Sequence, residues 1–211
     1  MKALLLKEKP LLLPTLLGFV LLIGSLFVNF YAGVYANEKA SNSVTDIVLS
    51  NTRVYDLDQV FIYGSWFLAL VIAVLAFIRP HRLPFILKSI ALFVFIRSIF
   101  LTLTHLAPFP NQIVIDPTSF LRYFVFGADL FFSGHTGLPF LMALIFWKDL
   151  YLRVFFIFLS VTFAVVVLLA HMHYSIDVLS AFFITYSIFC IAKVFFKKDW
   201  QVSQYGLPQT S

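Results

Sequence analysis

The sequence predicts an all-α polytopic membrane protein with six transmembrane helices. Hydrophobic residues fill 61% of its 211 positions and charged residues only 12%. A soluble domain of this length would carry far more charged surface. Apolar runs of roughly 20 residues, enough to cross a hydrocarbon core about 30 Å thick, lie at residues 11–34, 60–79, 84–106, 135–147, 152–170 and 177–196.

These runs follow one another without a linker, a low-complexity tract or an internal repeat. We therefore expect residues 1–211 to form a single integral membrane domain with short tails. The fourth run is short, and its start could lie nearer Asp129. The first run has a basic start and ends in GVYA, as a cleaved signal peptide would, but its apolar core is too long for a typical signal.

The net charge of +5 is a topology signal rather than a sign of nucleic-acid binding. In a six-span arrangement, the basic clusters fall on one side, and cationic loops mark the cytoplasmic side of a membrane. We expect both termini on that side and the acidic loops in the periplasm or outside. These clusters comprise Lys2, Lys7, Lys9, Arg79, Arg82, Lys88, Lys148, Arg153, Lys193, Lys197 and Lys198.

A small group of ionisable residues lies within or at the rim of the predicted spans. Such groups are costly in a membrane and usually face a cavity. A transporter is one alternative, but it would place them near the midplane, and only Arg97 fits that position. The others cluster at the predicted outer rim. The group comprises Arg97, His105, Asp129, His135, His171, His173 and Asp177.

The segment AHMHYSIDVLSA, residues 170–181, carries two histidines and an aspartate. His173 and Asp177 are four residues apart, which places them on one face of a helical turn. A carboxylate that holds one imidazole nitrogen leaves the other free and stabilises the imidazolium. This pattern is typical of an activated histidine nucleophile or base, although a structural hydrogen bond would use the same spacing.

The segment DLFFSGHTG, residues 129–137, has the composition of a helix start. Ser133 is a suitable N-cap, and Gly134 allows a ligand to approach the backbone closely. Free amides at a helix start bind anions, phosphate above all. His135 in the same turn could donate a proton to a leaving oxygen.

A zinc site built from His135, His171, His173 and Asp177 is a further alternative, because three histidines and a carboxylate form a feasible ligand set. On a helix, however, His171 and His173 would point apart. We therefore expect neither a metal nor a cofactor.

DLFFSGHT and AHMHYSIDV resemble the two catalytic motifs of the sphingomyelin synthase family, a branch of the PAP2-like superfamily of membrane lipid phosphatases and phosphotransferases. FIRSIFLTLTHLAPFP, residues 95–110, resembles a further motif with a shifted proline spacing, and SVTDIVLSNT, with Asp46, weakly resembles a fourth. The resemblance covers roughly residues 43–196 and implies a PAP2-like bundle of six helices with its active site at the outer leaflet.

The resemblance also implies roles for individual residues. His173 would be the nucleophile, Asp177 its orienting partner and His135 the acid for the leaving group. Phosphate would be met by Arg97, by Arg122 as a further candidate, and by the helix-start amides. The residues expected to bind substrate or phosphate are Arg97, Ser133, Gly134, Asp129 and His171.

The implied activity is headgroup transfer from a phospholipid donor to a lipid alcohol, ceramide-like or diacylglycerol, through a phosphohistidine. With water as acceptor, the same site would act as a lipid phosphatase or a phospholipase C-like hydrolase. Val167 stands where the wider superfamily often has an arginine six residues before the nucleophilic histidine, which disfavours the usual soluble-substrate phosphatase. The compact chain suits a protein of a bacterial cell membrane.

Overall fold

The computed structural model describes residues 9–110 and 130–207. Every regular element in these two ranges is helical, which confirms the predicted all-α membrane bundle. The helices are α2 (Lys9–Lys39), η1 (Leu49–Asn51), α3 (Asp58–Ile78), η2 (Pro80–Arg82), α4 (Leu83–Leu103), α5 (Gly134–Ile145), α6 (Leu150–Leu169), α7 (Ser175–Phe195) and α8 (Lys197–Tyr205).

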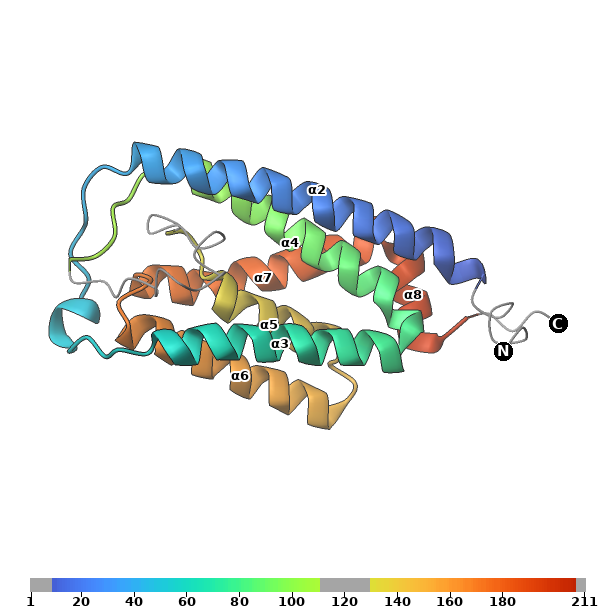
Figure 1. The fold of residues 1–211 in the computed structure, drawn as a ribbon. Helices are drawn as coiled ribbons and strands as arrows, with labels where there is room; N and C mark the ends of the chain where they lie inside the picture. The colour runs from blue at the N-terminus through green and yellow to red at the C-terminus, as the bar shows by residue number, and fades with distance from the viewer. Residues whose placement is uncertain (1–8, 111–129, 208–211) are drawn as a thin grey trace.

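The bundle has a short central helix surrounded by longer ones (Figure 1). Within the described ranges, α2, α3, α4, α6 and α7 are each long and apolar enough to cross a membrane. α2 packs along α4, whereas α5 contacts α4, α6 and α7. The described chain begins and ends at the same end of the bundle (Figure 1).

α5 is too short to cross a bilayer alone. Its 12 residues extend about 18 Å at 1.5 Å per residue. Leu141, Met142 and Ala143 are completely buried, so protein rather than lipid surrounds this helix. The non-helical residues beside it can therefore lie at membrane depth. The helix does not begin nearer Asp129, because Ser133 caps it and residues 130–133 are not helical.

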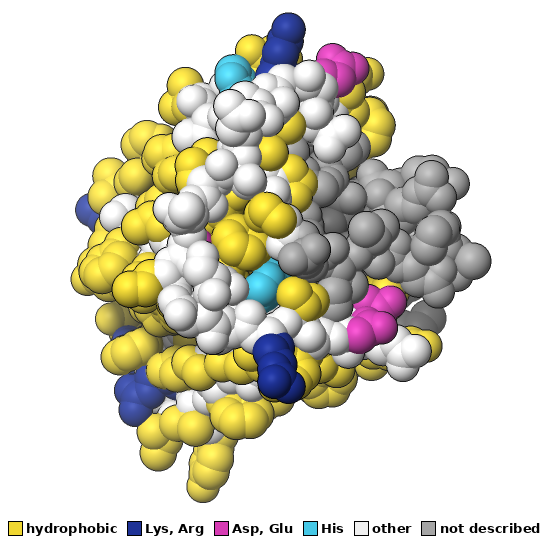
Figure 2. Space-filling view, turned by 90° about the vertical axis from the view of Figure 1, so that its left-hand side faces the viewer, with side chains coloured by type: hydrophobic (Ala, Val, Ile, Leu, Met, Phe, Trp, Pro, Cys, Tyr) yellow, Lys and Arg dark blue, Asp and Glu magenta, His cyan; other side chains and the backbone are white. Residues whose placement is uncertain are grey.

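Hydrophobic side chains cover much of the face seen in Figure 2, and they also fill the core of the bundle. Phe77 is 89% exposed on α3, while Phe85 and Phe156 are completely buried. An exposed apolar surface of this extent is what a lipid solvent requires. The structure is thus that of an integral membrane protein.

The basic loops lie at the end of the bundle opposite the histidine segment. Arg79 forms an ion pair of 2.7 Å with Asp149, and Lys88 forms one of 2.6 Å with Asp199. Asp199 belongs to α8, a short helix that the sequence analysis did not predict. Trp200 of α8 packs against Phe85 and Phe189, and this contact holds α8 across the end of the bundle.

Candidate active site

Both histidine motifs lie in the half of the bundle away from the basic loops (Figure 1). The first forms the start of α5. Ser133 is its N-cap, and the Ser133 hydroxyl accepts the backbone N–H of Thr136 at 3.3 Å. The first N–H groups of a helix have no acceptor within it. The amides of Gly134 and His135 are therefore the ones that remain for an anion at this helix start.

The second motif forms the turn between α6 and α7. His173 precedes α7, and Asp177 lies in its first turn. His173 Nδ1 and Asp177 Oδ2 are 3.4 Å apart, and both residues are buried. Because an ionised carboxylate only accepts hydrogen bonds, Nδ1 carries the proton in this pair. In the neutral imidazole, Nε2 of His173 is then the unprotonated nitrogen, as a nucleophile requires.

Asp177 also shapes the turn that carries His173. Its Oδ2 accepts the backbone N–H of Tyr174 at 3.1 Å, which caps the start of α7. Its Oδ1 is buried and has no hydrogen-bond partner among the described residues. The second carboxylate oxygen thus keeps its acceptor capacity for a ligand or a water molecule.

A backbone hydrogen bond ties the two motifs together. The Ser133 N–H donates to the Asp177 carbonyl at 3.0 Å. Ser133 precedes Gly134 and His135, while Asp177 holds His173. The capped start of α5 and the capped start of α7 are therefore neighbours, as one shared site requires.

His135 sits between two aromatic rings. Its ring centroid lies 4.0 Å from that of Phe61 on α3 and 5.8 Å from that of Phe163 on α6. Arg97, whose guanidinium is always charged, lines the same cavity as His135. Sequence reasoning did not find the two phenylalanines, because aromatic residues are so frequent in this chain that no local pattern distinguishes them.

Arg97 of α4 is held beside the start of α5. Its Nε donates to the Phe132 carbonyl at 3.4 Å, and its Nη1 lies 3.5 Å from Asn29 Oδ1. A Cβ atom on Gly134 would lie only 3.2 Å from Arg97 Nε. Glycine therefore allows the guanidinium to approach the amide end of α5, where it can contribute to an anion site.

Asn29 was missed in the sequence although a signal was present. It is the one carboxamide side chain in the first apolar run, residues 11–34. Its Oδ1 is also 3.4 Å from the hydroxyl of Ser98. A polar residue in a span usually faces the protein interior, and Asn29 does so here.

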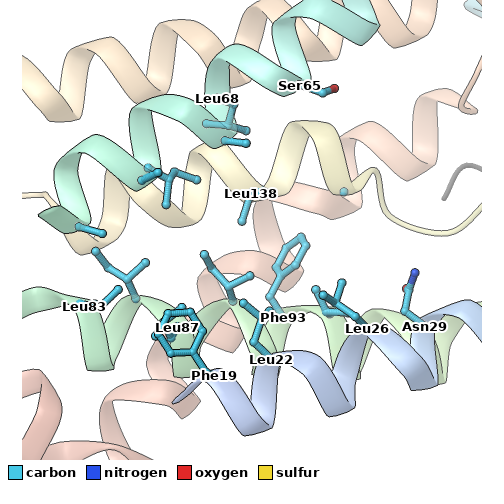
Figure 3. A pocket seen from close by; sticks show the side chains of 18 of the residues that line it. Phe19, Leu22, Leu26, Asn29, Ser65, Leu68, Leu83, Leu87, Phe93 and Leu138 are labelled. Atoms are coloured by element: carbon cyan, nitrogen blue, oxygen red, sulfur yellow. The ribbon is translucent and has the colours of Figure 1, made fainter. Parts of the chain in front are cut away.

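A cavity of about 1000 Å³ extends from this cluster into the bundle. It lies between α2 and α4 on one side and α3 and α5 on the other, and apolar side chains form its walls with Asn29 at one end (Figure 3). Arg97, Gly134 and His135 also line it. On α4 the lining extends from Leu83 to Arg97, about 21 Å at the helical rise.

The cavity has the chemistry of a site for an amphiphile. Lipid chains suit its apolar length, and an anionic group suits the polar end, where a guanidinium and helix-start amides converge. At the bundle end itself, Figure 2 shows a histidine side chain near the centre of a mostly uncharged surface.

For three residues that the sequence predicted to bind substrate or phosphate, binding stays a prediction. Asp129 lies outside the described residues, as does Arg122. His171 is buried, and its Nε2 lies 3.3 Å from Thr52 Oγ1 in the loop between α2 and α3. Its role in phosphate binding stays a prediction.

The described residues do not support the zinc alternative. In residues 9–110 and 130–207, no group of three or more histidine, cysteine, aspartate or glutamate side chains is placed to hold a metal ion. The described contacts of His171 lead to Thr52 and Phe109, whereas those of His173 lead to Asp177.

A family model described as PAP2 superfamily C-terminal matches residues 127–194, a range that includes both histidine motifs. Neither a curated protein nor a solved structure shows significant similarity to the chain. The match does not distinguish transfer from hydrolysis, and it does not reach the level of the sphingomyelin synthase family. It supports the PAP2-like resemblance and indicates a membrane enzyme of the lipid phosphatase or phosphotransferase type.

Proposed function

We propose that this protein transfers the phosphorylated headgroup of a phospholipid to a lipid alcohol, in the manner of a sphingomyelin synthase. One observation carries the proposal. The His173–Asp177 pair is joined through the Ser133–Asp177 hydrogen bond to the helix start bearing His135, and that helix start lies at the polar end of a long apolar cavity.

In the first step, Nε2 of His173 attacks the phosphorus of the donor. A P–N bond forms, and the P–O bond to diacylglycerol breaks. The negative charge of the bound phosphate favours the protonated form of His135, which gives its proton to the departing oxygen. Asp177 stabilises the positive charge that develops on His173, while Arg97 and the amides of α5 meet the charge on the phosphoryl oxygens.

In the second step, the hydroxyl of the acceptor lipid attacks the same phosphorus. Its proton passes to His135, the P–N bond breaks and His173 regains its starting state. A ceramide-like alcohol or diacylglycerol fits the apolar walls of the cavity. These walls also exclude water, which would otherwise compete as the acceptor.

The proposed orientation places this chemistry at the outer leaflet. Arg79, Arg82 and Lys148 lie at the opposite end of the bundle from the site, and cationic loops remain cytoplasmic. Donor and acceptor would then enter sideways from the outer half of the membrane, and both chain ends would lie in the cytoplasm of a bacterial cell.

The test uses the purified full chain in liposomes containing a panel of phospholipids, with and without ceramide or diacylglycerol. Mass spectrometry of the lipids should show a new phospholipid that requires the added alcohol and does not form with His173→Ala. Release of phosphate or phosphorylated headgroup without transfer would replace the transferase with a hydrolase. Turnover by His173→Ala at the wild-type rate would overturn the nucleophile assignment.

A further inference from the structure

The loop between α2 and α3 is bonded to the turn that carries His173. In this loop, residues 40–57, Asp46 is buried although its neighbours Thr45 and Ile47 are exposed. Asp46 Oδ1 accepts the N–H groups of Val48 at 2.8 Å and Leu49 at 3.0 Å. Its Oδ2 accepts the N–H of Ser175, the first residue of α7, at 2.7 Å.

Both oxygens of Asp46 are therefore engaged with backbone amides. Burial alone would raise the pKa of Asp46, but hydrogen bonds from the Leu49 and Ser175 amides outweigh burial and keep this pKa below its usual value. A negative charge at the N-terminus of α7 is also favoured by the helix dipole. The carboxylate thus holds the loop on the start of α7.

Thr52 makes a second attachment, and its hydroxyl determines the tautomer of His171. The Thr52 hydroxyl has one proton, which it donates to the Val48 carbonyl at 3.0 Å. Toward His171 Nε2, 3.3 Å away, it can only accept. Nε2 therefore carries the proton of a neutral His171, and burial favours that neutral form by lowering the pKa of His171.

His171 itself has a backbone conformation that needs support. Its φ of 55° is in the left-handed region, where a non-glycine residue is uncommon and strained. Residues held in this way persist when their surroundings determine them. The hydrogen bond to Thr52 acts on the side chain of this residue, two positions before His173.

Further hydrogen bonds attach the same turn to its surroundings. The Tyr55 N–H donates to the Leu169 carbonyl at 2.9 Å, at the end of α6. Tyr174 lies between His173 and Ser175, and its hydroxyl donates to the Ala107 carbonyl at 2.9 Å and lies 3.3 Å from the Val44 amide. The turn is therefore bonded on both sides of His173.

We infer that Asp46 and Thr52 are positioning residues, which act through Ser175 and His171 to hold His173 in line with Asp177 and the phosphorus atom. The inference rests on the proposed function only where it identifies His173 as the nucleophile. In this arrangement, His171 supports the turn that carries His173 instead of binding the phosphate.

The first experiment measures which ring nitrogen of each histidine is protonated, and it needs no substrate. Nitrogen-15 NMR of protein labelled at its five histidines, assigned by single substitutions, should show His171 protonated at Nε2. Thr52→Val should shift the His171 and His173 signals, and Thr52→Ser should restore them. Thr162→Val is the matched control, because Thr162 makes the same hydroxyl bond to the carbonyl four residues earlier on α6. Unchanged signals in Thr52→Val would overturn the inference.

The second experiment measures kcat and KM for lipid turnover. Thr52→Val should lower kcat about 10-fold with KM changed less than twofold, because misplacing a reactive group slows the chemical step. Asp46→Asn should lower kcat further, because the amide has a single acceptor oxygen. Either the Ser175 N–H or the N–H groups of Val48 and Leu49 then lose their acceptor. Asp56→Asn, in the same loop and exposed, should match wild type.

A double variant then tests the route through His171. Asparagine tolerates the left-handed region, so His171→Asn leaves the backbone intact. If Thr52 acts through His171, adding Thr52→Val to His171→Asn should cost no further kcat. Fully additive losses would contradict the inference. An inactive wild type would refute the proposed function while the NMR result still decided the role of Thr52.

Discussion

The two ends of the helix bundle bury charge in different ways. At the basic end, Arg79 and Lys88 each pair directly with an acid, Asp149 and Asp199, at 2.7 and 2.6 Å. At the other end, Asp46 and Asp177 are held by backbone amides and an imidazole. The basic end neutralises its charges, whereas the histidine end orients them.

Buried polar atoms without a hydrogen-bond partner occur at both ends of the described bundle. Among the described residues, Asp177 Oδ1 and His171 Nδ1 are buried without a partner at the histidine end. At the basic end, Nε and Nη1 of Arg82 are also without one, but its guanidinium lies 4.7 Å from the centroid of the Phe146 ring, a cation–π contact. The comparison teaches how a reactive site can be distinguished from buried charge alone. A buried carboxylate that is held in a fixed orientation, with one oxygen still able to accept a hydrogen bond, is the better indicator of such a site.

The largest expected effect is on activity and comes from the histidine end. His173→Ala should lower kcat by at least about 1000-fold, because it removes the proposed nucleophile. Lipid turnover measured by mass spectrometry checks this loss. The unfolding midpoint of the variant should stay close to that of wild type, and a large drop in stability would give His173 a structural role.

At the basic end the largest effect should be on stability. The Lys88 and Asp199 side chains are only 6% and 14% exposed, and breaking a buried ion pair costs about 3–5 kcal/mol. Lys88→Met should therefore lower the free energy of unfolding by roughly that amount, measured in detergent by denaturant titration. The double variant Lys88→Met, Asp199→Leu should recover most of the lost free energy of unfolding. A loss of activity in a folded Lys88→Met protein would contradict the assignment of stability to the basic end and of activity to the histidine end.

A smaller effect should follow from adding one methyl group beside Arg97. In Gly134→Ala the new Cβ would lie 3.2 Å from Arg97 Nε, which should displace the guanidinium and raise KM for the phospholipid about 10-fold, a factor worth about 1.4 kcal/mol. Gly24→Ala is the matched control, because nothing lies within 4 Å of its Cβ. Equal KM values for the two variants would remove Arg97 from substrate binding.

The smallest effect concerns the partly exposed pair of Arg79 and Asp149 at the basic end. The hydrogen bond from Arg79 is the main cause of the lowered pKa of Asp149. A carboxylate with a lowered pKa in the folded state stabilises the protein above its unfolded pKa of about 4, and that contribution disappears as the pH falls through the folded value. We expect at most about 1 kcal/mol, seen as acid destabilisation that Asp149→Asn lacks. Identical pH profiles would show that the pair contributes nothing.

Much of the site was predictable from local patterns. The spacing of His173 and Asp177 predicted their contact, because four residues make one helical turn, and the SGHT segment predicted a capped helix start. The structure brings these elements together through the Ser133–Asp177 hydrogen bond. The proposed catalytic roles of His135, His173 and Asp177 stay predictions until they are tested.

Other parts of the site depend on contacts that are distant in sequence. Asn29 meets Arg97 across 68 positions, and Thr52 meets His171 across 119. No periodicity connects such residues. The helix α8 was missed for a related reason, since packing of Trp200 against Phe85 and Phe189 stabilises it and its own sequence is mostly polar.

The sequence by itself determined that this protein is a helical membrane bundle with its charges sorted between two ends. A continuous apolar run of about 20 residues crosses lipid as a helix that bonds its own backbone groups, and charges within such runs are rare and conspicuous. Only the tertiary structure decided how the apolar helices enclose a cavity, which aromatic rings surround His135, and how Asp46 and Thr52 hold the turn of His173. Those features arise from side-chain packing between helices, and in a chain with 27 phenylalanines many pairings are compatible with the same hydrophobic pattern.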